Sequence, residues 1–92
     1  MSDPSAALQA LLGREVVLDL ASPFVILGTL TAADHRYLIL QDADVHDLRD
    51  TATTREIYVL KSRRHGISAN RQHVRVRRDE VVSLSALEDV IE

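Results

Sequence analysis

The amino-acid sequence predicts a mainly β protein, in which a short N-terminal α-helix is followed by five strands that form a small, strongly bent barrel. Three observations support this prediction. Apolar and polar residues alternate along several short segments, turn-forming residues separate these segments, and a glycine interrupts the second one. Alternation with a period of two residues is typical of strands with one buried face. Five short strands in an open sheet leave exposed edges, so closure into a barrel is favoured.

The helix is predicted over residues 4–12. Asp3 can cap the free N–H groups at its start, and Pro4 suits the first helical position because its fixed φ is already helical. Apolar residues then recur with helical spacing, and Gly13 can adopt the left-handed conformation that ends many helices. A helix of this length needs a surface to lie on.

The barrel is predicted over residues 14–85. Its strands are expected at residues 14–20, 24–32, 37–48, 55–64 (resuming at 73–78 after a loop or bulge) and 81–85. Gly28 lies in the middle of the second strand, which indicates a sharp bend or a close approach of two backbones. The long third and fourth strands should project beyond the barrel, so an extended hairpin insertion is predicted over about residues 44–73.

The composition limits the kinds of protein that this chain can be. Its 92 residues are expected to form a single domain, because the chain is too short for a second core. The absence of cysteine excludes disulfides, thiolate metal sites and a cysteine nucleophile. The chain has no signal-peptide pattern and no apolar run of about 18 residues, so a cytoplasmic protein without membrane contact is expected.

Charge is distributed unevenly along the chain. Residues 55–78 contain eight basic residues and one acidic residue, a net charge of +7, whereas the rest of the chain carries −10. Such segregation is typical of a phosphate-binding patch, but it also fits two faces that meet when copies associate, or a solvated arginine-rich strand and loop. The candidate basic patch comprises Lys61, Arg63, Arg64, Arg71 and Arg75.

Two segments, GTLTAADHRYLILQDA and VRRDEVVSL, together with the N-terminal PSAALQALLGREVVLDL, resemble the Sm and Sm-like (LSm) family in their order and spacing. The resemblance covers roughly residues 4–86. It implies an SH3-like or Sm-like five-stranded barrel whose fifth strand pairs with the fourth strand of the next copy. A homo-oligomeric ring of five to eight subunits would result. The expected interface residues are Val81, Val82, Ser83 and Leu84.

The resemblance also implies an RNA site on two turns. Asp34 matches the aspartate that braces the first turn, and His35 falls at the position that stacks on a base. Tyr37 stands where the family has asparagine. Arg77 matches the arginine of the second turn, and Arg78 replaces the glycine that follows it. Because Tyr37 lacks the donor–acceptor pair of an amide, weak base specificity is expected.

The sequence therefore predicts non-catalytic RNA binding by a ring-forming protein. The alternative is a scaffold of the same fold that contacts only proteins. An enzyme is not expected, since the chain lacks a Gly-framed serine and a Gly-rich phosphate loop. Asp42, Asp44 and His46 alternate along one strand and could bind a metal, but a solvent-facing strand explains them better, so neither a metal nor a cofactor is predicted.

Overall fold

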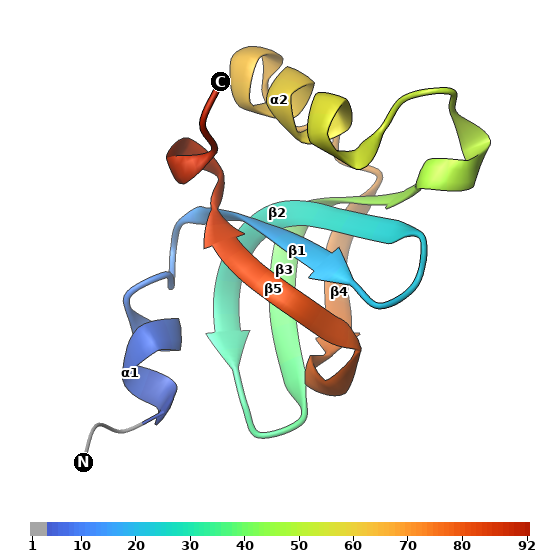
Figure 1. Ribbon diagram of the computed structural model, residues 1–92. Helices are drawn as coiled ribbons and strands as arrows, with labels where there is room; N and C mark the ends of the chain where they lie inside the picture. The colour runs from blue at the N-terminus through green and yellow to red at the C-terminus, as the bar shows by residue number, and fades with distance from the viewer. Residues whose placement is uncertain (1–3) are drawn as a thin grey trace.

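The structure, a computed structural model, describes residues 4–92 and confirms a short helix followed by a five-stranded antiparallel sheet (Figure 1). Three single-turn 3₁₀ helices follow β3, β4 and β5, at Leu48–Asp50, Arg78–Glu80 and Leu87–Asp89. The predicted cap Asp3 lies outside the described residues. The elements are α1 (Pro4–Gln9), β1 (Glu15–Leu20), β2 (Phe24–Ala33), β3 (Tyr37–Asp47), α2 (Arg55–His65), β4 (Arg71–Arg77) and β5 (Val81–Ala86).

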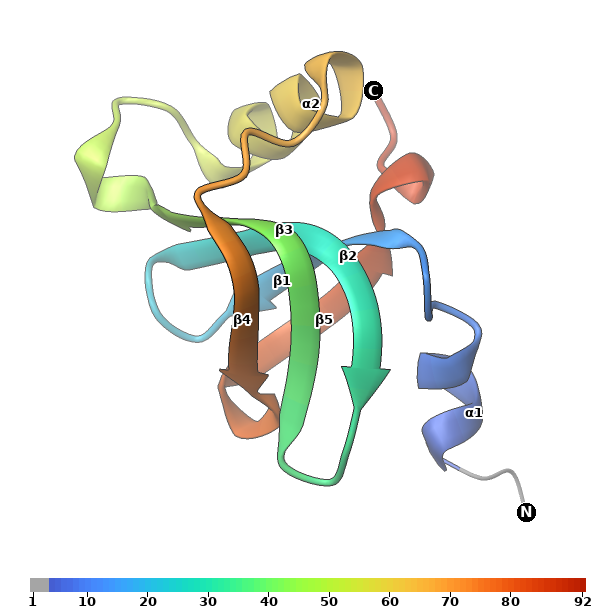
Figure 2. The same ribbon diagram turned by 180° about the vertical axis from the view of Figure 1, so that it is seen from behind.

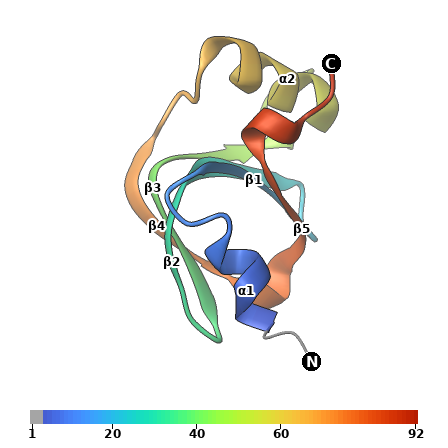
Figure 3. The same cartoon turned by 90° about the vertical axis from the view of Figure 1, so that its left-hand side faces the viewer.

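The sheet has the strand order β4-β3-β2-β1-β5 and curls strongly, as the view along it shows (Figure 3). Within residues 4–92, β4 and β5 pair with one neighbour each and not with one another. The predicted barrel is therefore open in the single chain. Two sheet edges remain available for hydrogen bonding to another chain.

Gly28 lies where the backbones of β2 and β3 come close together, one of the two possibilities that the sequence predicts. A Cβ atom at this position would lie 3.0 Å from both Cα and Cβ of Ala43. The pairing of β2 with β3 shifts register beside it, and Asp42 on β3 has a φ of 50°. The missing side chain and the left-handed residue together let the sheet bend sharply here.

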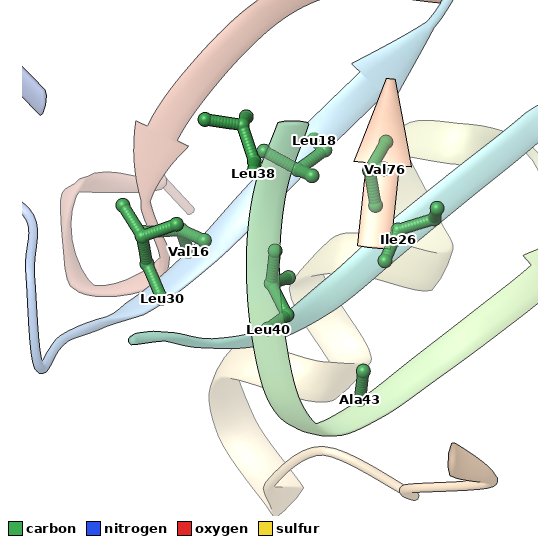
Figure 4. Packing of buried hydrophobic residues seen from close by; sticks show 8 residues of the cluster. All are labelled: Val16, Leu18, Ile26, Leu30, Leu38, Leu40, Ala43 and Val76. Carbon is green, nitrogen blue, oxygen red and sulfur yellow. The ribbon is translucent and has the colours of Figure 1, made fainter. Parts of the chain in front are cut away.

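Two hydrophobic clusters lie on opposite faces of this one sheet, where the sequence analysis expected a single core. The barrel cluster fills the concave side (Figure 4), and the outer cluster lies between the sheet and α2. Along β1, Val16 and Leu18 enter the barrel cluster and Val17 enters the outer one. Successive side chains of β1 therefore alternate between two apolar clusters, and not between a core and the solvent.

Residues 55–64 form most of α2, so the predicted fourth strand over this segment and the hairpin over residues 44–73 are wrong. The side-chain oxygen of Thr54 accepts a hydrogen bond from the N–H of Ile57 at 3.3 Å, which caps the helix. Gly66 follows the helix with a φ of 91° and donates its N–H to the carbonyl of Ser62. The fourth strand is β4 alone.

Different elements lie at the two ends of the barrel. Figures 1 and 2 show α2 beyond one end, whereas the turn between β2 and β3 and the turn between β4 and β5 lie at the other. Val59 of α2 packs on the outer cluster together with Leu87 from the C-terminal segment. Neither helix of the described chain has the length and apolar character that crossing a membrane requires.

Candidate nucleic-acid interface

Two turns that are distant in sequence meet at one end of the barrel because β3 pairs with β4. Tyr37 lies directly opposite Arg77 in this pairing. One step further, the N–H of Arg78 donates to the carbonyl of Arg36 at 2.8 Å, so the ladder continues into both turns. The sheet register therefore places the end of β4 beside the start of β3.

Asp34 holds the first turn in shape, as the family resemblance implies. Its carboxylate accepts hydrogen bonds from the N–H groups of Arg36 at 2.8 Å and Tyr37 at 2.7 Å. Its own N–H donates to the carbonyl of Tyr37 at 2.9 Å. The two backbone donors lower the pKa of the Asp34 carboxyl, which therefore remains ionised as an acceptor at neutral pH.

The side chains of the two turns surround a hollow of about 390 Å³, which we call the turn pocket. Asp34 braces the turn without lining the pocket, whereas the other four predicted RNA-binding residues line it. Tyr37 and Arg78 are half-buried, and the remaining lining residues are exposed. The pocket is lined by His35, Arg36, Tyr37, Arg77, Arg78 and Asp79.

Arg78 replaces the glycine of the family pattern without backbone strain. Asp42 is the only non-glycine residue with positive φ among residues 4–92, so the turn at Arg78 does not need a glycine. The Arg78 guanidinium donates to the carbonyl of Asp34. Arg78 thus joins the two turns and still leaves the pocket open.

Arg77 and Asp79 form an ion pair at the rim of the pocket, with 2.7 Å between Nη2 and Oδ2. The hydrogen bond that Arg77 donates to the Asp79 carboxylate raises the pKa of Arg77, which stays charged. Both side chains are about two-thirds exposed, so a ligand anion can compete for the guanidinium at low cost. Asp79 and Arg36 were missed as site residues, although each directly neighbours a predicted one in sequence.

Comparison with known proteins places this geometry in one fold. The Pyrococcus abyssii Sm protein, solved in complex with a uridine heptamer, is similar over 92% of this chain and 99% of its own, with a TM-score of 0.63 and 18% identity. The P. aerophilum SmAP1 heptamer is similar over 94% and 95%, with a TM-score of 0.64 and 23% identity. A heptameric archaeal Sm protein is similar over 88% and 96%, with a TM-score of 0.60 and 24% identity.

This chain has the Sm fold. No family model matches the sequence, and no curated protein matches it either. The similarity is therefore one of backbone structure over almost the whole chain, and few residues are identical.

The Sm fold separates the residues of the predicted basic patch. Arg71 and Arg75 lie on β4, which leads to the pocket, whereas Lys61 and two arginines lie on α2 beyond the opposite end. On α2, both Arg63 and Arg64 pair with the carboxylate of Glu92. Half of the basic residues between 55 and 78 thus lie on β4 or directly after it, whereas each arginine of α2 is already paired with a carboxylate.

The four predicted interface residues form the first part of β5, whose second edge is unpaired within residues 4–92. Val81 and Leu84 are half-buried against the barrel cluster, and the Ser83 hydroxyl donates to Asp19 at 2.7 Å. Val82 alone among them is a largely exposed hydrophobic residue, at 71%. An added strand would therefore meet mainly backbone groups and Val82.

Asp42, Asp44 and His46 do not share one solvent-facing surface, in contrast to the expectation from alternation. Asp44 is only 3% exposed, and its carboxylate accepts hydrogen bonds from the Tyr58 hydroxyl and from Asn70 Nδ2 at 3.3 Å. His46 stacks on the Tyr58 ring, with centroids 3.9 Å apart. The bend at Asp42 separates it from these two, and residues 4–92 contain no cluster suited to a metal ion.

Proposed function

We propose that this chain is a divergent Sm-like protein that assembles into a homo-oligomeric ring and binds single-stranded RNA at the turn pocket, without catalysis and with little base discrimination. The observation that carries the proposal is the turn pocket itself. It joins an imidazole, a phenol ring and three guanidinium groups on one exposed surface. Planar groups and cations together are what a single strand requires.

Base stacking is the first contribution. Tyr37 and Arg77 lie opposite each other in the sheet, and His35 extends from the adjoining turn. A base that enters the pocket can stack on these planar groups, at about 1–3 kcal/mol per base. Since no amide side chain lines the pocket, edge-on recognition of one base is not favoured.

Phosphate neutralisation is the second contribution. Arg36, Arg77 and Arg78 line the pocket, and only one acidic side chain accompanies them. Arg75 lies two residues before Arg77 on β4, which extends the positive surface along the strand. Most of the affinity should therefore come from the RNA backbone and should fall as salt rises.

Ring assembly is supported by the two unpaired sheet edges and by the neighbours with the same fold, two of which are heptamers. A ring of five to eight subunits would repeat the pocket once per subunit. Weak binding at each pocket would then add up along one RNA strand.

The test uses fluorescence anisotropy with labelled oligo-U, oligo-A and oligo-C over a salt series, on protein freed of nucleic acid by nuclease. We expect affinities for the three oligomers within about tenfold of each other. Arg77→Ala should weaken all three alike and reduce the salt slope by about 0.7 for each lost phosphate contact. Arg64→Ala on α2 is the matched control and should leave binding unchanged.

Absence of binding at low salt, or binding that does not respond to salt, contradicts the proposal. If the ring forms under those conditions, the protein is better described as a scaffold that contacts only proteins. A strong preference for one base would contradict the weak discrimination expected from Tyr37.

A further inference from the structure

A second hollow lies beside the free edge of β5, at the end of the barrel where α2 sits. Its volume is about 340 Å³, and we call it the α2 groove. Its lining includes Asp19 and Ser85 of the sheet, Arg55 and Glu56 of α2, and Asp89 and Ile91 of the C-terminal segment. Three elements thus enclose it: the β1–β5 edge of the sheet, α2, and the C-terminal segment.

The groove combines an apolar surface with unsatisfied negative charge. Asp19 pairs with Arg55 at 3.3 Å, but Glu56 and Asp89 form no ion pair among the described residues. Ile91 is 90% exposed on the same side. Burying the exposed isoleucine against a partner would be favourable. A partner with positive charge would also complement the two free carboxylates beside it.

The opposite edge of the sheet has the complementary charge. β4 contains Arg71, Arg75 and Arg77 and no acidic residue. Arg77 is paired with Asp79, whereas Arg71 and Arg75 form no ion pair within residues 4–92. One free edge is therefore basic and the other adjoins free carboxylates, which favours contact between copies of this chain.

The direction of the strands determines which residues would meet. β5 ends and β4 begins at the α2 end of the barrel (Figures 1 and 2). Rotation about a ring axis keeps this end on the same side in every copy. Antiparallel pairing of β4 with β5 of the next copy thus brings the start of β4, Arg71, to the end of β5, where the groove opens.

We propose that the α2 groove of one subunit is a docking site for the next subunit, which inserts Arg71 between Glu56 and Asp89. This inference rests on the proposed ring, and it adds a side-chain contact beside α2 to the pairing of the strand edges. The arginines of β4 then have separate tasks: Arg71 holds the assembly together, and Arg77 binds RNA.

The experiment measures the mass of the full chain by sedimentation velocity over a dilution series, at low and high salt. Asp89→Arg should raise the protein concentration at which the ring half-dissociates by about tenfold or more, because every interface then opposes like charges. The double variant Asp89→Arg with Arg71→Asp should restore most of the loss. Asp50→Arg, a charge reversal outside the groove, is the matched control.

A ring that withstands Asp89→Arg as well as the control does overturns the docking site but leaves the proposed ring and RNA binding intact. Failure of the double variant to recover, with both variants folded by circular dichroism, also overturns it. A wild-type chain that stays monomeric removes the ring and the docking site together, and the RNA titrations above then report separately on the turn pocket.

Discussion

The two ends of the barrel are held together in different ways. At the turn pocket, exposed charged side chains rest on a framework of backbone hydrogen bonds and one bracing carboxylate, Asp34. At the α2 end, the buried carboxylate of Asp44 connects the segments by accepting hydrogen bonds from the half-buried Tyr58 and from Asn70. Side chains at the first end are therefore free to contact RNA, whereas the hydrogen-bonded group around Asp44 at the second end maintains the fold. Substitutions should affect binding at one end and stability at the other.

The largest effect is expected at the buried carboxylate. Asp44→Ala leaves the Tyr58 hydroxyl without its acceptor beneath α2. Asn70 Nδ2, in contrast, loses only one of its two acceptors and keeps the carbonyl of Val45. Because a half-buried hydroxyl loses its partner, the free energy of unfolding should fall by about 3 kcal/mol. Urea denaturation measures this change. Gln41→Ala, at an exposed position of the same strand, should cost far less, and RNA affinity per folded molecule should not change. Equal urea midpoints for the two variants would contradict the contrast between the ends.

The bend between the two ends gives the next largest effect. Gly28→Ala places a Cβ 3.0 Å from two atoms of Ala43, one of them in the backbone, so β2 and β3 must move apart. We expect a loss of about 2 kcal/mol in the free energy of unfolding, typical of overpacking in a tight core. Ala32→Ser, on an exposed position of the same strand, should unfold at nearly the wild-type urea concentration.

At the pocket, Arg78→Ala should weaken RNA binding clearly while it lowers the free energy of unfolding only slightly. The substitution removes one cation and the hydrogen bond that joins the two turns. We expect about three- to tenfold weaker RNA binding, and less than about 1 kcal/mol of lost stability because the group is partly exposed. Anisotropy and urea titrations on the same preparation compare the two. A stability loss as large as that of Asp44→Ala would show that this end is structural as well.

The smallest effect concerns the pH dependence of the first turn. The folded pKa of Asp34 lies below its ordinary value of 3.8, so the ionised carboxylate stabilises the turn above that pH. This contribution is lost as the pH falls through the folded pKa. The stability advantage of the wild type over Asp34→Ala should therefore be present at neutral pH and should shrink as the pH falls below the ordinary value of 3.8. An advantage that stays constant as the pH falls would contradict the role of the charge.

Alternation and turn residues were sufficient to predict β1, β2, β3 and β5, because each of these strands lies between strong turn signals. They failed at α2, where the run Ile57–Leu60 is apolar enough to resemble a strand. The local signals were nevertheless helical: Thr54 at the start, Glu56 in the first turn, basic residues in the last turn, and then Gly66. Giving these signals more weight than a short apolar run would have identified the helix.

Four of the six residues that line the turn pocket could be predicted, since sheet register and short turns are local properties that motif spacing reflects. The environment of Asp44 could not be predicted. Its burial depends on the left-handed residue Asp42, which reverses the expected face of the strand, and on a helix placed over it by tertiary packing. Similarly, the pairing of Arg63 and Arg64 with Glu92 joins segments that no sequence pattern relates.

The outer cluster has a consequence for how this chain can change over evolution. Val17, Val25 and Leu27 are apolar on the face that α2 covers. A deletion that removes α2 from the connection between β3 and β4 would expose these side chains to water. Every subunit would then have an exposed hydrophobic patch that favours aggregation. Loss of the helix would then require several simultaneous substitutions in β1 and β2.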